Sequence, residues 1–270
     1  MRLIEERIAQ MARERQRLAE ELRFFDAGLW LGRPEGFPLA QELTPECLAE
    51  TLRARFLTGG LVSHWRGKTV SAQDGNEALT ELPTGNATEL FATWTGLPLF
   101  PEEEGPLPGR EGLPDDVRAV RVFPRSHNFP LATWCVGSLC EWLVARRMPL
   151  FIWHTELDWP ALFGLAGAFP ALQIVVESQT QKILYHTHAL FALMRECSNV
   201  SVELSNFAGQ GFIEHAVAHF GAERLIFGSF LPVNDPLVPM GLLLDAAISA
   251  EEKALIAGGN LRRMADQVRP

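Results

Sequence analysis

The chain has 270 residues, 47% of them hydrophobic, and carries a formal net charge of −9. The acidic balance argues against binding to the phosphate backbone of a nucleic acid, and no apolar run approaches the ~20 residues of a membrane span. The four scattered cysteines are too few for a disulfide framework, and the charged start, MRLIEERIAQMARERQ, does not resemble a signal peptide. We therefore expect a cytoplasmic protein with a sizeable core and no nucleic-acid or membrane partner.

Residues 2–23 are expected to form one helix that precedes the main domain. Its heptad-like apolar stripe, interrupted by Arg15, consists of Ile4, Ile8, Met11, Leu18 and Leu22. The stripe predicts a helix that lies across the floor of the domain or against a neighbouring subunit, so we expect a homo-oligomer contact through it. The chain then divides into an N-terminal helix, residues 1–23, and a single domain, residues 24–270.

Eight strand-like runs follow, and helical patterns separate most of them. The runs are FFDAGLWL (24–31), GLVSHW (60–65), ELFATWTG (89–96), VRAVRVFP (117–124), PLFIWHT (149–155), LQIVVES (172–178), VSVELS (200–205) and RLIFGSF (224–230). Mostly apolar strands that alternate with helices predict a parallel sheet covered by helices. Because eight such units close a barrel, we predict a (β/α)8 TIM barrel, with an open doubly wound sheet as the alternative. The Gly-, Pro- and acid-rich stretches at 67–86 and 101–116 are predicted to be loops.

Two patterns that resemble binding or catalytic motifs do not meet the requirements of the chemistry, and a third motif is absent. In GLVSHWRGKT (60–69), six residues separate Gly60 from Gly67, which is longer than the spacing of a phosphate-binding loop. His215 and His219 share a helix face, but Ala216 stands where a zinc protease needs glutamate. No GxSxG nucleophile elbow occurs. These patterns therefore predict neither a nucleotide site nor a serine hydrolase.

The functional side chains of a TIM barrel lie at the C-terminal ends of its strands. The candidate substrate-binding residues selected by this rule are Trp30, Trp65, Trp94, Arg121, Arg125, His127, Ser178, Asn206 and Phe230. Aromatic rings with a few polar groups are typical of a small-molecule pocket. Arg121 and Arg125 are expected to bind a substrate carboxylate. The alternative for Arg121 is an interior arginine paired with a barrel carboxylate such as Glu203.

Several segments resemble the amidohydrolase-2 branch of the amidohydrolase superfamily. FPALQIVVES (169–178) and NVSVELSN (199–206) are similar to its sixth and seventh strands, and MPLFIWHTE (148–156) is similar to its fifth. GAERLIFGSFLPVNDP (221–236) resembles the eighth-strand motif Gly-x-x-Arg-hydrophobic-x-Phe-Gly-Ser-Asp-x-Pro, and SAEEKALIAGGNLRRM (249–264) resembles the closing helix pair. The resemblance implies a TIM barrel of the metal-dependent hydrolase and decarboxylase type.

The resemblance also implies that most metal ligands of that family are replaced in this chain. Its first strand ends in His-x-His, and the matching positions here are Gly28 and Trp30. Its sixth-strand histidine corresponds to Ser178, and its eighth-strand aspartate corresponds to Phe230. Only His154 on the fifth strand is retained. Because a catalytic zinc needs about three protein ligands, we expect no metal cofactor.

Two classes of function follow from these observations. The first is an amidohydrolase-like hydrolase or lyase for a small carboxylated or cyclic metabolite, with His154 as acid/base and Glu177 or Glu156 tuning its pKa. Within this class, a rebuilt zinc or manganese site from His154, Glu177 and His127 is a further alternative. This class predicts an open cavity where these side chains converge.

The second class is a non-catalytic descendant that keeps the barrel as a small-molecule-binding or assembly module. It predicts that Trp30, Trp94, Phe230 and their neighbours fill the cavity that the family uses for chemistry. The state of the barrel mouth therefore discriminates between the two classes.

Overall fold

The computed structural model describes residues 2–80, 82, 89–98 and 113–269. Its eight strands form one sheet and are β1 (Phe24–Leu31), β2 (Leu57–His64), β3 (Glu89–Thr95), β4 (Val117–Val122), β5 (Leu150–Trp153), β6 (Ile174–Glu177), β7 (Val200–Glu203) and β8 (Leu225–Ile226). Each strand pairs in parallel with the next strand in the chain. Beyond β8 the chain returns to β1, because Ala27 N–H donates to Phe227 O at 3.1 Å and Trp30 N–H donates to Leu231 O at 2.9 Å. The predicted (β/α)8 barrel is thus confirmed, and the open doubly wound sheet is wrong.

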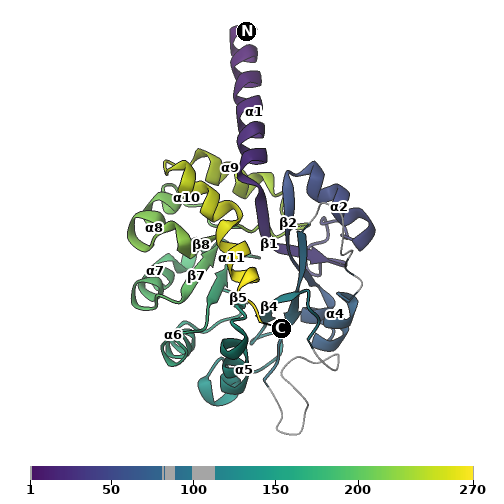
Figure 1. Cartoon of the computed structure of the whole chain (residues 1–270), viewed down its shortest axis with the longest axis vertical. Helices are drawn as coiled ribbons and strands as arrows, with labels where there is room; N and C mark the ends of the chain where they lie inside the picture. Colours follow the sequence, from purple (N-terminus) through teal and green to yellow (C-terminus); the bar gives the residue numbers. More distant parts are fainter. Residues whose placement is uncertain (1, 81, 83–88, 99–112, 270) are drawn as a thin grey trace.

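Helices surround this ring of strands, except for the N-terminal helix, which projects from it (Figure 1). They are α1 (Arg2–Leu22), α2 (Pro45–Ala54), α3 (Arg66–Thr69), α4 (Ala72–Ala78), α5 (Thr133–Arg146), α6 (Trp159–Ala168), α7 (Thr187–Glu196), α8 (Phe212–Phe220), α9 (Leu237–Asp245), α10 (Ala250–Ala254) and α11 (Asn260–Asp266). Short 3₁₀ turns span Ile183–His186 and Ala222–Arg224, and a π-helical turn, Leu255–Gly259, joins α10 to α11. None of the helices in the described part of the chain is long and apolar enough to cross a membrane.

Part of the segment 67–86 is helical, which corrects its prediction as a loop. Helices α3 and α4 lie within residues 66–78. The Ser71 hydroxyl caps α4 by accepting the Asp74 N–H at 3.0 Å. Side-chain capping orders a stretch whose composition alone indicates irregular structure. Residues 101–112 of the second predicted loop lie outside the described residues.

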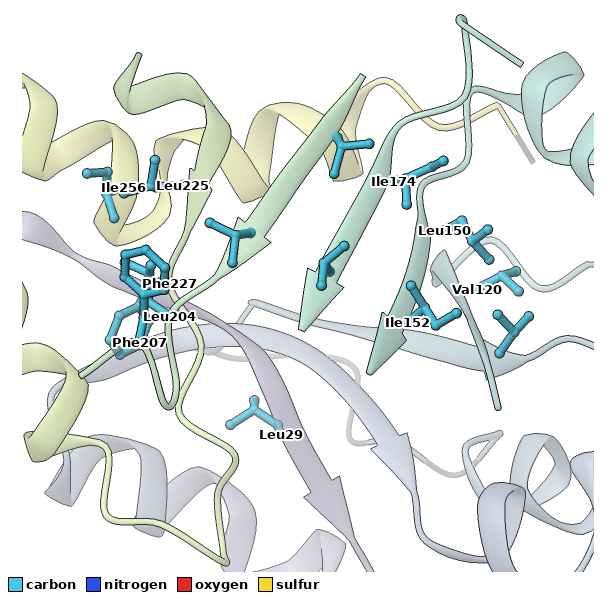
Figure 2. Packing of buried hydrophobic residues seen from close by; sticks show 14 of the residues in the cluster. Leu29, Val120, Leu150, Ile152, Ile174, Leu204, Phe207, Leu225, Phe227 and Ile256 are labelled. Carbon is cyan, nitrogen blue, oxygen red and sulfur yellow. The ribbon is translucent and has the colours of Figure 1, made fainter. Parts of the chain in front are cut away.

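The larger hydrophobic core lies between the strands and the surrounding helices. Figure 2 shows part of it along β4 to β8, where Val120, Ile152 and Ile174 pack in neighbouring strands. Phe227, which follows β8, stacks edge-on against Phe24 at 4.6 Å between ring centroids. This outer core holds the helices in place around the barrel, and it leaves the alternate side chains of each strand to fill the interior.

The interior side chains form successive levels along the barrel axis. The level nearest the N-terminal ends of the strands is apolar, is packed against Leu261 and Met264 of α11, and contains Phe25, Ala27, Leu61, Ala119, Phe151, Val175 and Ile226. Two residues further along β2, β4 and β6, the same face carries the polar side chains of Ser63, Arg121 and Glu177. Another two residues on, it carries Trp65 on the β2 side and Phe123 on the β4 side. The period of two therefore places a polar level between an apolar floor and an aromatic top.

Candidate functional site

Five aromatic rings occupy the mouth of the barrel, at the C-terminal ends of the strands. This aromatic cluster consists of Trp30, Trp65, Phe123, Trp153 and Phe230. Trp30 is at its centre, with ring centroids 4.9 Å from Trp65 and 5.2 Å from Trp153. All five side chains are at most 3% exposed. The mouth is therefore closed by packed rings.

Two further side chains cover the aromatic cluster from outside. Phe37, in the loop after β1, lies 5.5 Å from Phe230 and 6.0 Å from Trp65 between ring centroids. The Lys68 ammonium lies 5.4 Å from the centroid of the Trp153 ring, a geometry that favours cation–π attraction. Lys68 Nζ also lies 3.4 Å from Glu156 Oε1, so its charge is balanced by a carboxylate.

Beneath the aromatic cluster, Arg121 and Glu177 form a bidentate ion pair. Arg121 Nε donates to Glu177 Oε2 at 2.8 Å, and Arg121 Nη2 donates to Glu177 Oε1 at 2.6 Å. The guanidinium also donates to the carbonyl of Ala27 at 3.1 Å and to the hydroxyl of Ser63, and it lies 4.7 Å from the centroid of the Trp30 ring. Both partners are at most 1% exposed. The two charges therefore satisfy each other within the barrel.

Gln179 connects the ion pair to the aromatic cluster. Its amide nitrogen donates to Glu177 Oε1 at 2.6 Å, and its amide oxygen accepts the Trp30 Nε1–H at 2.8 Å. The orientation of Trp30 is thus set by a buried hydrogen-bond chain that ends at Arg121. Sequence reasoning missed Gln179 because its role depends on contacts between different strands.

Glu203 and Asp26 add two further buried carboxyl groups. Burial raises the pKa of Glu203 to about 8, and the nearby carboxylate of Glu177 contributes to this rise. Glu203 accepts hydrogen bonds from the backbone N–H groups of Ser178 at 3.0 Å and Ser205 at 2.7 Å. Burial likewise raises the pKa of Asp26 to about 6, against hydrogen bonds that lower it. With Arg121 as their cationic neighbour, the three carboxyl groups favour partial protonation near neutral pH.

His154 lies at the end of β5 and is neutral at physiological pH. Its Nδ1 lies 3.1 Å from the carbonyl oxygen of Glu177, so Nδ1 carries the proton and Nε2 presents a lone pair. Within the described part of the chain, Nε2 has no hydrogen-bond partner. Burial lowers the pKa of His154 to about 4, and the neighbouring His186 ring contributes to this effect.

Of the other polar candidates, His127 and Arg125 lie in separate local networks, whereas Ser178 belongs to the hydrogen-bond network of Glu203. His127 Nε2 lies 3.2 Å from the Lys68 carbonyl, and Arg125 donates to the Leu157 carbonyl at 3.1 Å. Ser178 Oγ lies 3.4 Å from Glu203 and accepts the Asn206 N–H at 2.8 Å. Each group is engaged with its own neighbours.

Two expectations about the interior differ from the structure. Trp94 belongs to the outer core between strands and helices, not to the aromatic cluster. Arg121 was predicted either to bind a substrate carboxylate or to pair inside the barrel with Glu203. It is an interior arginine, but its carboxylate partner is Glu177. The sequence reasoning also missed Phe123 and Trp153. Their signal was available, because each lies two residues beyond an interior position of its own strand, Arg121 and Phe151 respectively.

Concave surfaces among the described residues lie at the rim of the barrel and, on its outside, between α1 and α9. One is a groove of about 780 Å³ between the loop after β1 and the loop after β8. An ion pair of 3.2 Å between Arg55 and Asp235 lies beside it. A smaller pocket of about 280 Å³, lined by Arg125, Glu156 and Asp158 among others, lies outside β4 and β5. None of these surfaces has a member of the aromatic cluster in its lining.

Metal-binding side chains do not gather anywhere in the described ranges. No group of three or more His, Cys, Asp or Glu residues with the geometry to hold a metal ion occurs in them. His154 is surrounded by the carbonyl of Glu177 and the ring of His186.

A protein-family model described as "Amidohydrolase" matches residues 115–264 of the chain. No curated protein matches the sequence significantly. The family match covers β4 to α11, the part of the chain in which the sixth- to eighth-strand segments of the sequence were recognised.

Solved structures with the same fold include hydrolases and decarboxylases. A zinc-bound amidohydrolase from Burkholderia multivorans matches with a TM-score of 0.64 and 17% identity, over 90% of this chain and 99% of that one. The 5-carboxyvanillate decarboxylase from Sphingomonas paucimobilis has a TM-score of 0.63 and 12% identity, over 92% and 100%. The 2,6-dihydroxybenzoate decarboxylase from Rhizobium has a TM-score of 0.64 and 13% identity, over 90% and 99%. At these identities the likeness shows the fold alone.

Proposed function

Because this chain belongs to the amidohydrolase family, whose model matches residues 115–264 of it, we propose that it is a non-catalytic member of that family. In this proposal the inherited metal site has been replaced by side-chain packing, and the barrel serves as an assembly module. The observation that carries the proposal is the aromatic cluster at the barrel mouth. TIM-barrel chemistry takes place at that end, and here five buried rings occupy it.

The space around Gly28 supports this proposal. A Cβ atom added to Gly28 would lie 2.9 Å from the Phe230 backbone nitrogen and 3.1 Å from the Gln179 side-chain nitrogen. No imidazole fits at this position without displacement of the backbone after β8. The residues present therefore do not fit a metal held between the ends of β1 and β8.

The engagement of Glu177 supports it as well. A carboxylate with two hydrogen bonds from Arg121 and one from Gln179 would have to lose the cationic partner to bind a metal. Breaking a buried ion pair leaves an uncompensated charge and costs roughly 3–5 kcal/mol. His154 and Glu177 are thus a poor starting set for a rebuilt zinc or manganese site.

A second candidate function is metal-free acid/base chemistry at His154. The observation that favours it is the lone pair of Nε2, which is buried and has no partner among the described residues. A neutral imidazole with a pKa of about 4 acts as a weak base near pH 7. This candidate requires a path to the ring, because His154 is 2% exposed and the His186 ring lies 5.5 Å from it between centroids.

Metal content and decarboxylation assays on the full chain test both candidates. Protein purified without chelator is expected to contain well below one zinc, manganese or iron ion per chain. It is expected to release no CO₂ from 5-carboxyvanillate or 2,6-dihydroxybenzoate, with or without added Zn²⁺ or Mn²⁺. Near-stoichiometric metal would overturn the proposed loss of the site. Metal-independent CO₂ release that disappears in His154→Gln would establish the second candidate instead.

A further inference from the structure

Helices α1 and α9 enclose an apolar groove of about 500 Å³ on the outside of the barrel. Each helix lines it with one face, at positions i, i+3, i+4 and i+7. The lining residues are Ala12, Arg15, Gln16 and Ala19 of α1, Leu237, Met240, Gly241 and Leu244 of α9, and Phe56. A groove between two helix faces is the shape that a third amphipathic helix fits.

The surface around this groove is unusually apolar for an exposed helix. Leu237 and Val238, in the first turn of α9, are 46% and 60% exposed, and Leu242 is 37% exposed. Arg15, a cation among the described lining residues, is neutralised by an ion pair with Asp245 at the end of α9. Exposed apolar residues that adjoin each other in this way mark an interaction surface.

The N-terminal half of α1 stands clear of the barrel in Figure 1, whereas the other half is rooted beside α9. Burial along α1 agrees with this picture, because Ala19 is buried while Ala9, Gln10 and Ala12 are exposed. In the sequence, the stripe that contains Leu18 and Leu22 continues at Ile4, Ile8 and Met11. A helix with such a stripe is stabilised mainly by packing against a partner.

We propose that the groove binds the projecting half of α1 from a second copy of the chain. The two copies are related by a two-fold axis near the middle of α1, so the two α1 helices run antiparallel. Each projecting half then lies between α1 and α9 of its partner. The interface becomes a four-helix cluster of α1 and α9 from both copies, closed and symmetric.

Lengths and connectivity favour this occupant. The chain's own α1 forms one wall of the groove and cannot also fill it. The projecting half, residues 2–11, is ~15 Å long at 1.5 Å per residue, and the nine residues of α9 span ~13.5 Å. Groove and helix are adjacent on the same chain, so one two-fold operation fills both grooves. Small residues at Ala12, Ala19 and Gly241 let the helix backbones approach closely.

The charges on α1 favour the antiparallel direction. Glu5 lies in the first turns, whereas Arg13 and Arg17 lie in the second half, and all three are exposed. An antiparallel pair centred near residue 11 places Glu5 of one copy opposite Arg17 of the other. A parallel pair would place Glu5 opposite Glu5 and Arg17 opposite Arg17 of the other copy, and like charges at that distance repel.

The inference deepens the proposed assembly role and rests on it for its biological purpose, but its test is independent of metal content. Dimerisation can therefore fail while the metal site is still absent, and metal can be found in a protein that still dimerises. The two failures are distinguishable because one is measured as mass and the other as bound metal.

Light scattering and sedimentation of the full chain test the proposal. The expected mass is twice the 30.0 kDa of one chain. Ala12→Arg is expected to raise the dimer dissociation constant by more than ~100-fold, because an unpaired charge would be buried in each half of the symmetric interface. Gln10→Arg adds the same charge about 200° around the helix and is expected to leave the dissociation constant unchanged. Circular dichroism checks that both variants keep the fold.

A charge exchange tests the antiparallel direction. Glu5→Arg alone is expected to weaken the dimer several-fold, and Glu5→Arg combined with Arg17→Glu is expected to restore it. A monomeric wild-type chain at all accessible concentrations would overturn the proposal, as would a dimer that survives Ala12→Arg. Capture of a different protein by a monomeric chain would count against it too, since the groove would then belong to another partner.

Discussion

Ionisable side chains are buried in the barrel interior, where an unpaired charge costs free energy. Arg121 faces Glu177 in a bidentate pair, while Glu203 and Asp26 have hydrogen bonds to backbone N–H groups. Since all three carboxyl groups are fully buried, their full ionisation would leave two negative charges without a cationic partner. Proteins relieve such a site by shifting pKa values, as seen for Glu203 at about 8 and Asp26 at about 6.

The raised pKa of Glu203 predicts that stability falls as pH rises. Between the ordinary value of 4.5 and about 8, the folded state keeps a proton that the unfolded chain has lost. The free energy of unfolding therefore decreases across this window, by up to about 1.4 kcal/mol per pH unit. The pKa of Asp26, raised from 3.8 to about 6, adds a decrease of the same sign at lower pH.

Urea denaturation at a series of pH values between pH ~6.5 and ~8 measures this dependence. Glu203→Gln carries no titrating group, so its stability is expected to fall less than that of the wild type in this range. The exposed Glu196→Gln variant serves as the control and should follow the wild type. Parallel pH curves for Glu203→Gln and the wild type would contradict the assignment.

At the scale of elements, the short helix α4 is attached to the sheet by one buried side chain. Asn76 Nδ2 donates to the Thr95 carbonyl at 3.1 Å, and the Thr95 N–H donates to Asn76 Oδ1 at 2.7 Å. Asn76 thus continues the hydrogen bonding of β3 at the C-terminal end of the strand. A glycine-rich segment folds as helix here because of this contact and the Ser71 cap.

Asn76→Ala is expected to destabilise the protein by roughly 2–4 kcal/mol, because it leaves a buried N–H and a buried carbonyl of Thr95 unpaired. The exposed Gln73→Ala variant, in the same helix, is expected to change stability by less than about 0.5 kcal/mol. The midpoints of urea denaturation of the two variants measure the difference. Equal midpoints would show that water replaces the lost hydrogen bonds.

At the scale of the whole molecule, the barrel is filled from floor to mouth. The apolar floor rests on α11, the Arg121–Glu177 pair occupies the middle, and the aromatic cluster closes the top. In an enzyme the mouth of such a barrel is kept open for the substrate, and active-site residues often reduce stability. Here the mouth is packed like a core, which favours a structural role for the residues in it.

Trp30→Ala discriminates between a structural and an active-site role for the cluster. A cavity at its centre is expected to lower the free energy of unfolding by roughly 3–5 kcal/mol. The control is Trp134→Ala, because Trp134 is 81% exposed, and its effect is expected to stay within about 0.5 kcal/mol. Thermal and urea denaturation measure both variants. Unchanged or increased stability in Trp30→Ala would indicate a strained, functional site.

The architecture of the barrel could be predicted from the amino-acid sequence. Eight apolar runs separated by helical patterns predict parallel strands and crossover helices, because each run must be covered on both sides. The eighth-strand segment (221–236) also identified the family correctly. The sequence did not indicate the bulge between Asp26 and Leu29, which shifts the register of β1 against β2 where Gly28 lies.

The pairing of the interior side chains could not be predicted without the folded barrel. Arg121 on β4 takes Glu177 from β6, and not Glu203 from β7, as its partner, and Trp94 faces the outer helices. Alternation along a strand groups residues into two faces, but it does not say which face is inside or which side chains from other strands meet there. Those choices depend on barrel closure and on the volume that packed rings must fill, which are properties of all eight strands together.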